Sequence, residues 1–561
     1  MVDLKSLLSN RKKMGLFIGV SIIIIGVIPL FFLTFFPELK QSYTIKPLAL
    51  ETEDGVYISA FKYTPKGEKS HGGVVVGHSF FGNKLNMQPI SIELAKRGFT
   101  VINIDFRGHG ASGGFFARNK VIFDMKAAID YLENDLSYIT EIGLVGHSLG
   151  AYAALSLSNS YPHRINSTVV IGAISTKVLN ISNLLMISGK FDLGLTEDQL
   201  LEVLRIYTGR EDPEIGVVYD GDFINGNNTK AYISPFADHL SEVVDYSVIY
   251  QTIQWLEQSF NGQKGKNIII TAPALQFFSY FSLVGIIILN SIFVVYLANF
   301  LFKRKKKNID KKILINYKEI SIYRLILHYT FLVESIQIFI FLLLSTLSED
   351  ILSWSTTSLT LSLIIGASIG SFLMYNFILL NTRPKYTIKD FFYKAKSMSS
   401  SNPGRSIIFG FIIVLFSILS IAAIWHWSIQ NTLPTLRGIG SIILLTIISF
   451  PFLFIREFYF RSIQNKLQYS THYEEYFVMI GIGIFIDNFL ILCIIIVGKL
   501  NFAYLPPYAL YLLAWVVFSI IQNCTVTWVY IQSRNILGST IFSSIFYAWM
   551  LVVFFPSYGF L

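Results

Sequence analysis

The stretch Gly-His-Ser-Leu-Gly at residues 146–150 decides the fold expected for the first half of this 561-residue chain. It lies between a short apolar run, residues 142–145, and a helix-forming run, residues 151–157. A serine between two glycines at such a junction is typical of a sharp turn that holds the hydroxyl above a sheet. Glycines tolerate the turn because they have no Cβ, and the helix N-terminus stabilises negative charge beside the hydroxyl. The pattern predicts that Ser148 is a nucleophile.

Two further strand ends precede this serine. Residues 73–77 form an apolar run that leads into His-Ser-Phe-Phe-Gly-Asn at 78–83, and residues 100–105 lead into Arg-Gly-His-Gly-Ala-Ser-Gly at 107–113. With the serine motif, these stretches resemble the α/β-hydrolase superfamily, on the side of its serine aminopeptidase-like and monoacylglycerol lipase-like members. The resemblance covers about residues 43–262. It implies an α/β fold with a mostly parallel sheet and helices on both faces.

The resemblance also implies an oxyanion hole. Its two donors would be the backbone N–H groups of Phe80 and of Leu149, the residue after the nucleophile. The chain departs from the family pattern at Ser79, where glycine is usual. The donor is a backbone amide, so this change need not remove the hole. A plain strand-to-helix turn stays as the alternative interpretation.

In this family the acid and the base follow the serine in that order. Residues 184–189 read as a buried strand, and Asp192 directly after it is the expected acid by resemblance. Asp220 and Asp222 remain rivals, because they lie in a predicted hairpin. His239 is the expected base, since among the domain's histidines only this one follows the acid candidates. A solvated surface histidine is the alternative interpretation of His239.

Many lipases of the superfamily insert a helical lid between the strands that precede the acid. Here only about ten residues separate the expected strand 167–173 from the one that begins near Leu184. We therefore expect no lid insertion, and a site that is open or covered by something outside the hydrolase domain.

The rest of the chain reads as membrane protein. Hydrophobic residues make up 53% of the sequence, and a run of about 20 apolar residues crosses a bilayer. The first run is too long for a signal peptide and lacks a small-residue cleavage site, which predicts a retained anchor. We expect that anchor within residues 1–39, a hydrolase domain at 40–266, and an all-α bundle of about eight transmembrane helices at 267–561. The nine apolar runs are 14–36, 275–302, 322–346, 356–380, 407–429, 438–455, 476–498, 506–531 and 538–556.

Basic residues predict the orientation of these spans. Loops on the side of the N-terminus hold 23 lysines and arginines, including the Lys-Arg-Lys-Lys-Lys run at 303–307, against 2 in the alternate loops. Positive charge near span ends marks the cytoplasmic side, so the hydrolase domain is expected outside the cytoplasm at the cell membrane. The hydrolase domain itself holds 20 basic and 24 acidic residues. The net charge of +9 is therefore a topology signal and predicts no nucleic-acid partner.

Polar residues inside the expected spans have two interpretations. Glu334 and Asp487 are ionisable groups at membrane depth, where they mark a proton or substrate path or an interhelical hydrogen bond. Five residues are expected at the inner boundary in a solvated or interfacial position: Arg456, Glu457, His472, Glu474 and Glu475. No zinc spacing, phosphate loop or dinucleotide fingerprint occurs, so neither a cofactor nor a metal is expected. The two cysteines, Cys493 and Cys524, both fall in expected spans.

Three functional hypotheses follow. The first is a multi-pass serine hydrolase with a Ser148–Asp192–His239 triad that cleaves esters, including lipid-derived ones, or amides on the outer face of the membrane. The second is a transporter or lipid-handling protein whose hydrolase-like domain binds without cleaving. The third is an acyltransferase that uses the same serine. The expected partners are a small-molecule or lipid-like acyl substrate and membrane lipid. Protein partners, the oligomeric state and the role of the C-terminal helices are not predicted.

Overall fold

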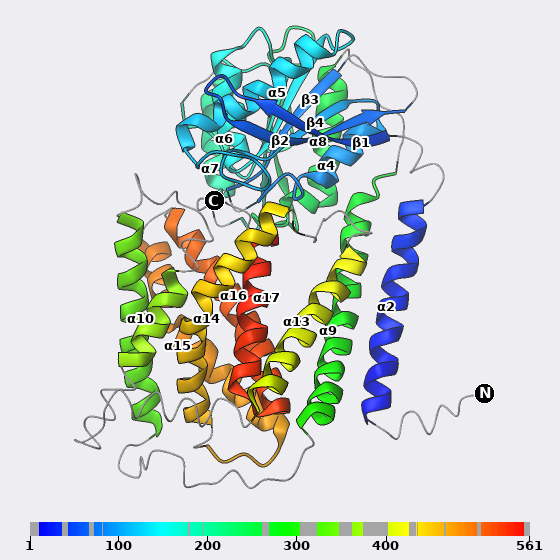
Figure 1. Cartoon of the computed structure of the whole chain (residues 1–561). Coiled ribbons are helices and arrows are strands. Elements are labelled where there is room, and N and C mark those ends of the chain that lie inside the picture. Colours follow the sequence, from blue (N-terminus) through cyan, green and yellow to red (C-terminus); the bar gives the residue numbers. More distant parts are fainter. Residues whose placement is uncertain are drawn as a thin grey trace. The chain divides into compact units, whose positions relative to one another are not determined.

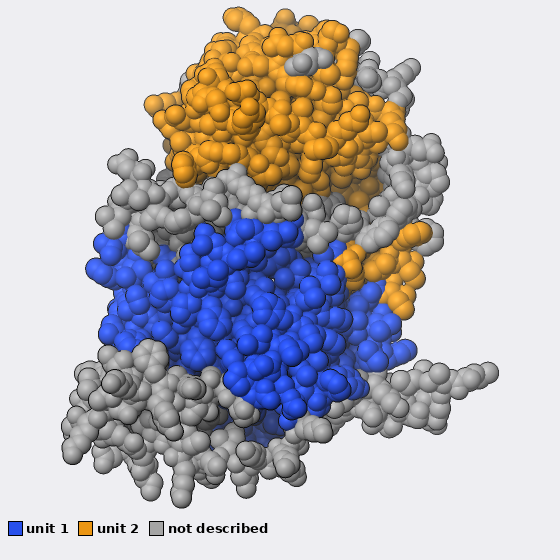
Figure 2. All heavy atoms as spheres, in the orientation of Figure 1, with its two compact units in different colours: residues 1–23, 283–422, 433–553 blue, residues 24–282, 423–432, 554–561 orange. Residues whose placement is uncertain are grey.

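The computed structural model divides into two compact units, one mostly of residues 24–282 and the other mostly of residues 283–422 and 433–553 (Figure 2). Each unit is described separately. The described residues are 11–35, 43–66, 72–80, 82–177, 180–192, 194–260, 269–302, 322–346, 362–373, 402–425, 434, 436–464, 467–501 and 507–554.

The first unit contains a nine-stranded sheet in the order β1-β2-β4-β3-β5-β6-β7-β9-β8 (Figure 1). The six central strands, β4, β3, β5, β6, β7 and β9, are parallel to one another. The outer strands β1, β2 and β8 are antiparallel to their neighbours. The strands are β1 (Tyr43–Glu51), β2 (Tyr57–Pro65), β3 (Gly72–Gly77), β4 (Thr100–Ile104), β5 (Glu141–His147), β6 (Ser167–Ile171), β7 (Leu184–Gly189), β8 (Val218–Tyr219) and β9 (Thr229–Ser234).

Helices cover both faces of the sheet, because alternate strand residues point to opposite sides. On β3, Val75 packs into one hydrophobic cluster while Val74 and Val76 pack into the other. The first cluster includes residues of α5, α6 and α7, and the second includes residues of α4 and α8. This arrangement confirms the predicted α/β-hydrolase fold class. The helices are α4 (Gln88–Lys96), α5 (Val121–Asp135), α6 (Leu149–Ser160), α7 (Glu197–Thr208) and α8 (Tyr246–Ser259), with short 3₁₀ helices η1 (Arg118–Lys120) and η2 (Glu242–Val244).

Long apolar helices make up most of the other unit, together with the N-terminal helix. Among the described residues, six helices are long and apolar enough to cross a membrane, which fits the predicted fusion to a membrane domain. The predicted number of about eight C-terminal spans stays a prediction, because α10, α16 and the short helix Ser362–Leu373 do not meet the same criterion. The helices are α2 (Arg11–Phe35), α9 (Ala272–Phe302), α10 (Ile322–Thr346), α13 (Pro403–Trp425), α14 (Leu436–Gln464), α15 (His472–Asn501), α16 (Pro507–Ser533) and α17 (Ile536–Phe554).

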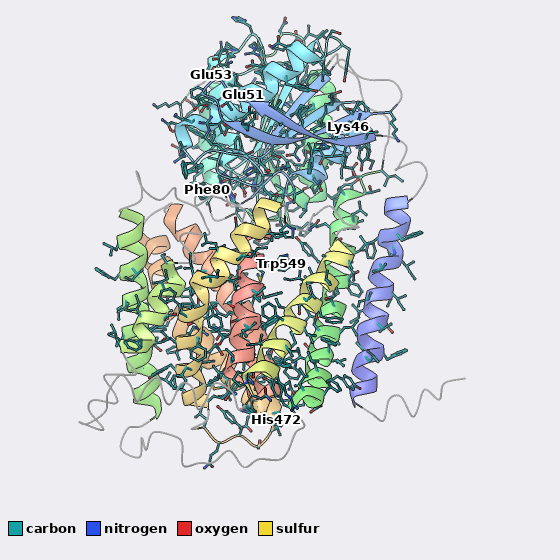
Figure 3. All side chains as sticks on the ribbon, in the orientation of Figure 1. Lys46, Glu51, Glu53, Phe80, His472 and Trp549 are labelled. Atoms are coloured by element: carbon teal, nitrogen blue, oxygen red, sulfur yellow. The ribbon has the colours of Figure 1, made fainter. Side chains whose placement is uncertain are left out.

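A buried ion network joins α14 to its neighbours and corrects the expectation of solvated inner-boundary charges. Arg456 pairs with Asp487 of α15, Arg461 lies 2.7 Å from Glu457, and Glu475 pairs with Arg534. These side chains are mostly buried, because each charge has an opposite partner that offsets its desolvation. In contrast, the nearby His472, labelled in Figure 3, is exposed.

Glu334 also makes a contact between helices. One of its carboxylate oxygens accepts a hydrogen bond from the backbone N–H of Leu490 on α15. For both Glu334 and Asp487, the contacts of the described residues therefore agree with the simpler of the two interpretations, polar contacts that join helices.

Candidate active site

Ser148 lies in a strained turn between β5 and α6. Its φ of 53° falls in the left-handed region, which residues other than glycine rarely adopt. A Cβ on Gly146 would come within 2.1 Å of the Gly150 carbonyl oxygen, and a Cβ on Gly150 within 2.2 Å of the Gly77 carbonyl oxygen. Both glycines are required because the turn packs backbone directly against backbone. The sequence pattern thus forms the local geometry that was expected from it.

The loop after β3 contacts the same turn. The backbone N–H of Gly150 donates to the carbonyl of His78 at 3.0 Å, which ties α6 to the loop that carries Phe80. His78 Nε2 accepts from the backbone of Phe106 at 3.0 Å, so its Nδ1 carries the hydrogen and donates to the Ser79 carbonyl at 2.6 Å. Burial lowers the pKa of His78 to about 3, and the ring is therefore neutral near pH 7. His78 fixes the loop locally.

The expected oxyanion donors come from these two joined segments. Leu149 is the first residue of α6, and Phe80 lies three residues after the end of β3 (Figure 3). The carbonyl of Phe80 lies 2.9 Å from His109 Nε2, and its ring packs edge-on against Phe116 with centroids 4.8 Å apart. These contacts fix the ring and the carbonyl of Phe80, and the peptide that carries its N–H is held through the Ser79 carbonyl, which accepts from His78. Preorganised donors of this kind need such support to be effective.

His239 and Asp192 are in direct contact. His239 Nδ1 lies 2.8 Å from Asp192 Oδ2, and the Asp192 side chain is fully buried whereas that of His239 is 21% exposed. The other carboxylate oxygen of Asp192 accepts from the backbone N–H groups of Gly194 at 2.6 Å and Leu195 at 3.2 Å. Asp192 is therefore held in one orientation. It contacts His239 through Nδ1, and Nε2 is the ring nitrogen that does not face Asp192.

Ser148 and His239 both lie against the carboxyl end of β6. The N–H of Ser148 donates to the carbonyl of Ile171 at 2.8 Å. The next residue, Gly172, has a φ of 67°, and a Cβ there would come within 2.9 Å of His239 Nδ1. Ser148, Asp192 and His239 all follow carboxyl ends of parallel strands, where the sites of open α/β sheets lie.

The rival acids Asp220 and Asp222 lie at the opposite ends of the parallel strands from His239. The predicted hairpin exists as β8 and β9, and Tyr219 pairs with Thr229, the first residue of β9. Asp220 and Asp222 therefore lie at the amino end of β9, whereas His239 follows its carboxyl end. Asp222 instead accepts a hydrogen bond from the N–H of Ile224 at 2.9 Å, within its own turn.

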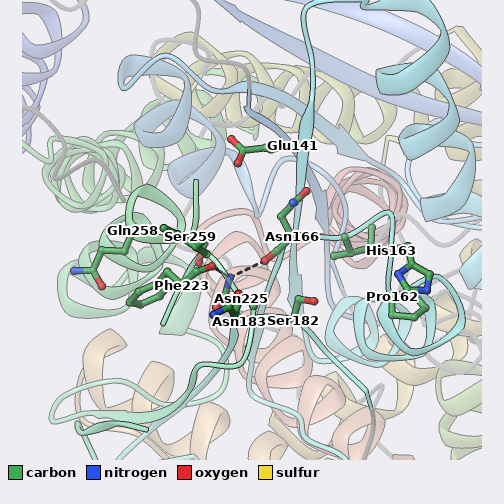
Figure 4. A pocket seen from close by; sticks show the side chains of 13 residues that line it. Glu141, Pro162, His163, Asn166, Ser182, Asn183, Phe223, Asn225, Gln258 and Ser259 are labelled. Carbon is green, nitrogen blue, oxygen red and sulfur yellow. Dashed lines mark hydrogen bonds between the residues drawn. The ribbon is translucent and has the colours of Figure 1, made fainter. Parts of the chain in front are cut away.

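A cavity of about 210 Å³ also lies at this amino edge (Figure 4). Glu141 at the start of β5 lines it, together with Asn166 and Asn183 just before β6 and β7. The Asn183 amide donates to the Asn166 carbonyl at 3.0 Å. Because the cavity is at the opposite edge from Ser148, it does not belong to the candidate active site.

Glu242 was missed by the sequence reasoning. It is fully buried in η2, and Oε2 lies 3.2 Å from His147 Nε2 and 3.9 Å from His239 Nδ1. Its position three residues after His239 is the only signal in the sequence, and a glutamate after a loop histidine is too common to be diagnostic. Within the described part of the chain, His147, His239 and Glu242 are also the one group of three side chains that offers ligand atoms close enough for a metal ion.

Large apolar side chains are exposed beside Asp192 and His239. Phe191, next to Asp192, is 62% exposed, and Leu240, next to His239, is 67% exposed. Phe236 is 82% exposed, and its loop is joined to that of Phe191 by a hydrogen bond from the Phe191 N–H to the Ala237 carbonyl. The site therefore carries an exposed apolar rim, formed by Phe191, Phe236 and Leu240.

Comparisons with known proteins agree with the fold. Residues 73–202 match the family model described as alpha/beta hydrolase fold, a stretch that includes Ser148 and Asp192. The chain is 24% identical over 197 residues to the alpha/beta hydrolase domain-containing protein WAV2 of Arabidopsis thaliana, covering 33% of this chain and 64% of that protein. It is 36% identical over 106 residues to a probable alcohol acetyltransferase of Cyberlindnera jadinii, covering 18% of this chain and 29% of that protein.

The chain thus spans less than two thirds of the length of these curated relatives. Among solved structures, an esterase of Pyrococcus furiosus is 20% identical, with a TM-score of 0.32 and coverage of 40% of this chain and 95% of that one. Residues 73–202 match the family model, and the sheet has the order and connections of that fold. The chain therefore carries an α/β-hydrolase domain, fused to a set of long apolar helices.

Proposed function

We propose that this protein is a membrane-embedded serine hydrolase that cleaves acyl esters with Ser148 as nucleophile, His239 as base and Asp192 as acid. The observation that carries the proposal is the 2.8 Å contact of His239 with Asp192 at the sheet edge where the strained Ser148 turn lies. The family match of the domain supports a hydrolase or acyl-transfer chemistry for this edge.

The proposed reaction has two steps. Ser148 Oγ attacks the ester carbonyl carbon while His239 Nε2 takes its proton, and Asp192 stabilises the imidazolium through Nδ1–H. The oxyanion of the tetrahedral intermediate accepts hydrogen bonds from the N–H groups of Phe80 and Leu149. His239 then gives its proton to the departing alkoxide, and the alcohol leaves an acyl-serine. In the second step water attacks the acyl-serine, and the carboxylic acid is released.

The exposed apolar rim supports a lipid-derived acyl group as substrate, because large exposed apolar patches mark sites that bind apolar partners. We expect the purified full chain in detergent to hydrolyse p-nitrophenyl esters and monoacylglycerols faster than peptide amides. Initial rates across acyl chains of two to sixteen carbons measure the preference. Rates that rise with chain length support the lipid-like substrate, and cleavage of peptides alone would contradict the ester assignment.

A second candidate function is acyl transfer to an alcohol, which the similarity to proteins named as probable alcohol acetyltransferases supports. The acyl-serine is the same, and only the acceptor in the second step changes. Supplying ethanol or glycerol with an activated ester separates the two functions. Formation of the new ester in excess over free acid, at alcohol concentrations far below that of water, indicates a transferase.

The orientation of the membrane helices is also a proposal, with the hydrolase domain outside the cytoplasm. It rests on the excess of basic residues in the loops on the side of the N-terminus. In a chain with Cys493 and Cys524 replaced by serine, we expect a Ser160→Cys variant to react with a membrane-impermeant thiol reagent on intact cells. Ser160 is exposed at the end of α6.

The matched variant is Ser470→Cys, because Ser470 is exposed between α14 and α15, on the side predicted to be cytoplasmic. It should react only after the membrane is permeabilised. The reverse pattern would place the hydrolase domain in the cytoplasm.

A further inference from the structure

Glu242 contacts all three segments of the candidate catalytic site. Its Oε1 accepts a hydrogen bond of 2.6 Å from the N–H of Gly189, where β7 ends before Asp192. Its Oε2 lies 3.2 Å from Nε2 of His147, the residue directly before Ser148. Glu242 itself follows His239 by three residues and is fully buried. One side chain thus joins the serine turn, the acid loop and the base loop.

The contact between Glu242 and His147 requires a proton. Within the described residues, Glu242 Oε2 and His147 Nε2 are both buried and have no hydrogen-bond partner. His147 also forms a hydrogen bond with the backbone of His239. A neutral imidazole that donates through one nitrogen has an acceptor at the other. One hydrogen between Glu242 Oε2 and His147 Nε2 therefore satisfies both buried atoms, and it lies on Glu242 when His147 donates to the His239 backbone through Nδ1.

The electrostatic surroundings agree with a proton on Glu242. Burial, followed by the nearby charge of Asp192, raises the pKa of Glu242 from 4.5 to about 10. Burial holds the pKa of His147 well below its usual range, so the proton does not move to that ring. The titratable groups around Glu242 are His147, His239, Asp192 and Asp238, and the two aspartates both favour its neutral form.

We propose that Glu242 is a positioning residue that acts as a neutral acid, joining the three catalytic loops and leaving the Asp192 carboxylate to pair with His239 Nδ1. The inference rests on the proposed function, because it assigns Glu242 a task at the same site. A second negative charge 3.9 Å from His239 Nδ1 would stabilise the imidazolium before the reaction and leave less of the neutral ring that takes the Ser148 proton.

The test compares Glu242→Gln with Glu242→Ala in the full chain, in native membranes. Glutamine keeps an oxygen for the Gly189 N–H and supplies an N–H for His147, so labelling by a fluorophosphonate probe should stay within about threefold of wild type. Alanine removes both contacts, and the labelling rate should fall by about 10²-fold, the scale expected from a displaced catalytic group. Glu257→Gln and Glu257→Ala are the matched controls, since Glu257 is buried on α8, where it lies 3.7 Å from Arg97.

The pH dependence of stability tests the protonation of Glu242 separately, because a carboxylate that is ionised in both the folded and the unfolded chain would not produce it. The folded-state pKa of Glu242 is raised, so between about pH 4.5 and 10 the unfolded chain releases this proton and the folded chain keeps it. Wild type therefore loses stability as pH rises through that window, and Glu242→Gln does not lose this contribution. The temperature at which labelling is lost after heating should favour Glu242→Gln by a margin that widens from pH 5 to pH 9.

Each outcome decides the inference. Equal labelling of Glu242→Ala and the Glu257 controls overturns the positioning role. A Glu242→Gln variant as impaired as Glu242→Ala, or a stability margin that does not change with pH, overturns the neutral acid. A wild type that the probe does not label at Ser148 overturns the proposed function and this inference with it, which separates that failure from the others.

Discussion

We expect Ser148→Ala to abolish covalent labelling by a fluorophosphonate and to lower ester turnover by about 10⁶-fold, the scale measured for a lost serine nucleophile. The reason is that alanine has no side-chain oxygen at the turn after β5, so nothing at this position can form a bond to phosphorus or to an acyl carbon. In-gel fluorescence of probe-treated membranes measures the first effect, and initial rates on the best ester of the substrate series measure the second. Ser160→Ala, at the exposed end of α6, is the control and should match wild type.

His239→Ala should cause a loss similar to that of Ser148→Ala, because the serine and the base act as one unit. A residual rate of about 10³-fold over water is expected from substrate binding and the Phe80 and Leu149 donors alone. Labelling that persists in Ser148→Ala contradicts the assignment of the nucleophile. Full activity of His239→Ala would leave Ser148 without the base proposed for it.

Asp192→Asn should lower kcat by about 10⁴-fold with a smaller change in KM, the loss seen when the acid of a serine triad becomes an amide. The amide N–H faces His239 Nδ1 and favours the tautomer with its hydrogen on Nε2, which cannot take the proton from Ser148. The remaining oxygen still accepts from the Gly194 and Leu195 N–H groups, so the loop is expected to keep its shape. The temperature at which Asp192→Asn loses its residual labelling on heating should match that of wild type, which checks that the fold survives.

Asp222→Asn is the matched control, because it is the same chemical change in a carboxylate at the opposite edge of the sheet. It should alter turnover by less than about twofold, since Asp222 bonds to Ile224 and Asn225 within its own turn. A large loss in Asp222→Asn together with a mild one in Asp192→Asn would transfer the role of acid to the hairpin.

Most of the fold is predictable from local patterns. The strands of the parallel sheet are short apolar runs, and their ends are marked by glycine and polar residues, as at residues 73–77 and 184–189. The Ser148 turn is equally local, because its two glycines and the flanking strand and helix are contiguous in the chain. The apolar helices are also visible in the sequence, since a membrane span needs only a long apolar run.

Other features depend on which distant segments meet. Resemblance favoured Asp192 over its rivals Asp220 and Asp222. The pairing of β7, β9 and β8 places Asp192 at the strand ends that precede His239 and the two rivals at the opposite ends. Arg456 and Asp487 were expected to be separate polar residues, yet their helices bring them together as a buried pair.

Glu242 shows the same limit most clearly, because its partners Gly189 and His147 lie 53 and 95 positions away and have no pattern in common with it. Sequence by itself determined the elements, the nucleophile turn and the candidate histidine, since each depends on neighbouring residues. Resemblance named Asp192 as the expected acid, and the tertiary structure decided between it and its two rivals and showed the glutamate buried behind the histidine, because hydrogen bonds and charge pairs depend on distance in space and not on distance along the chain.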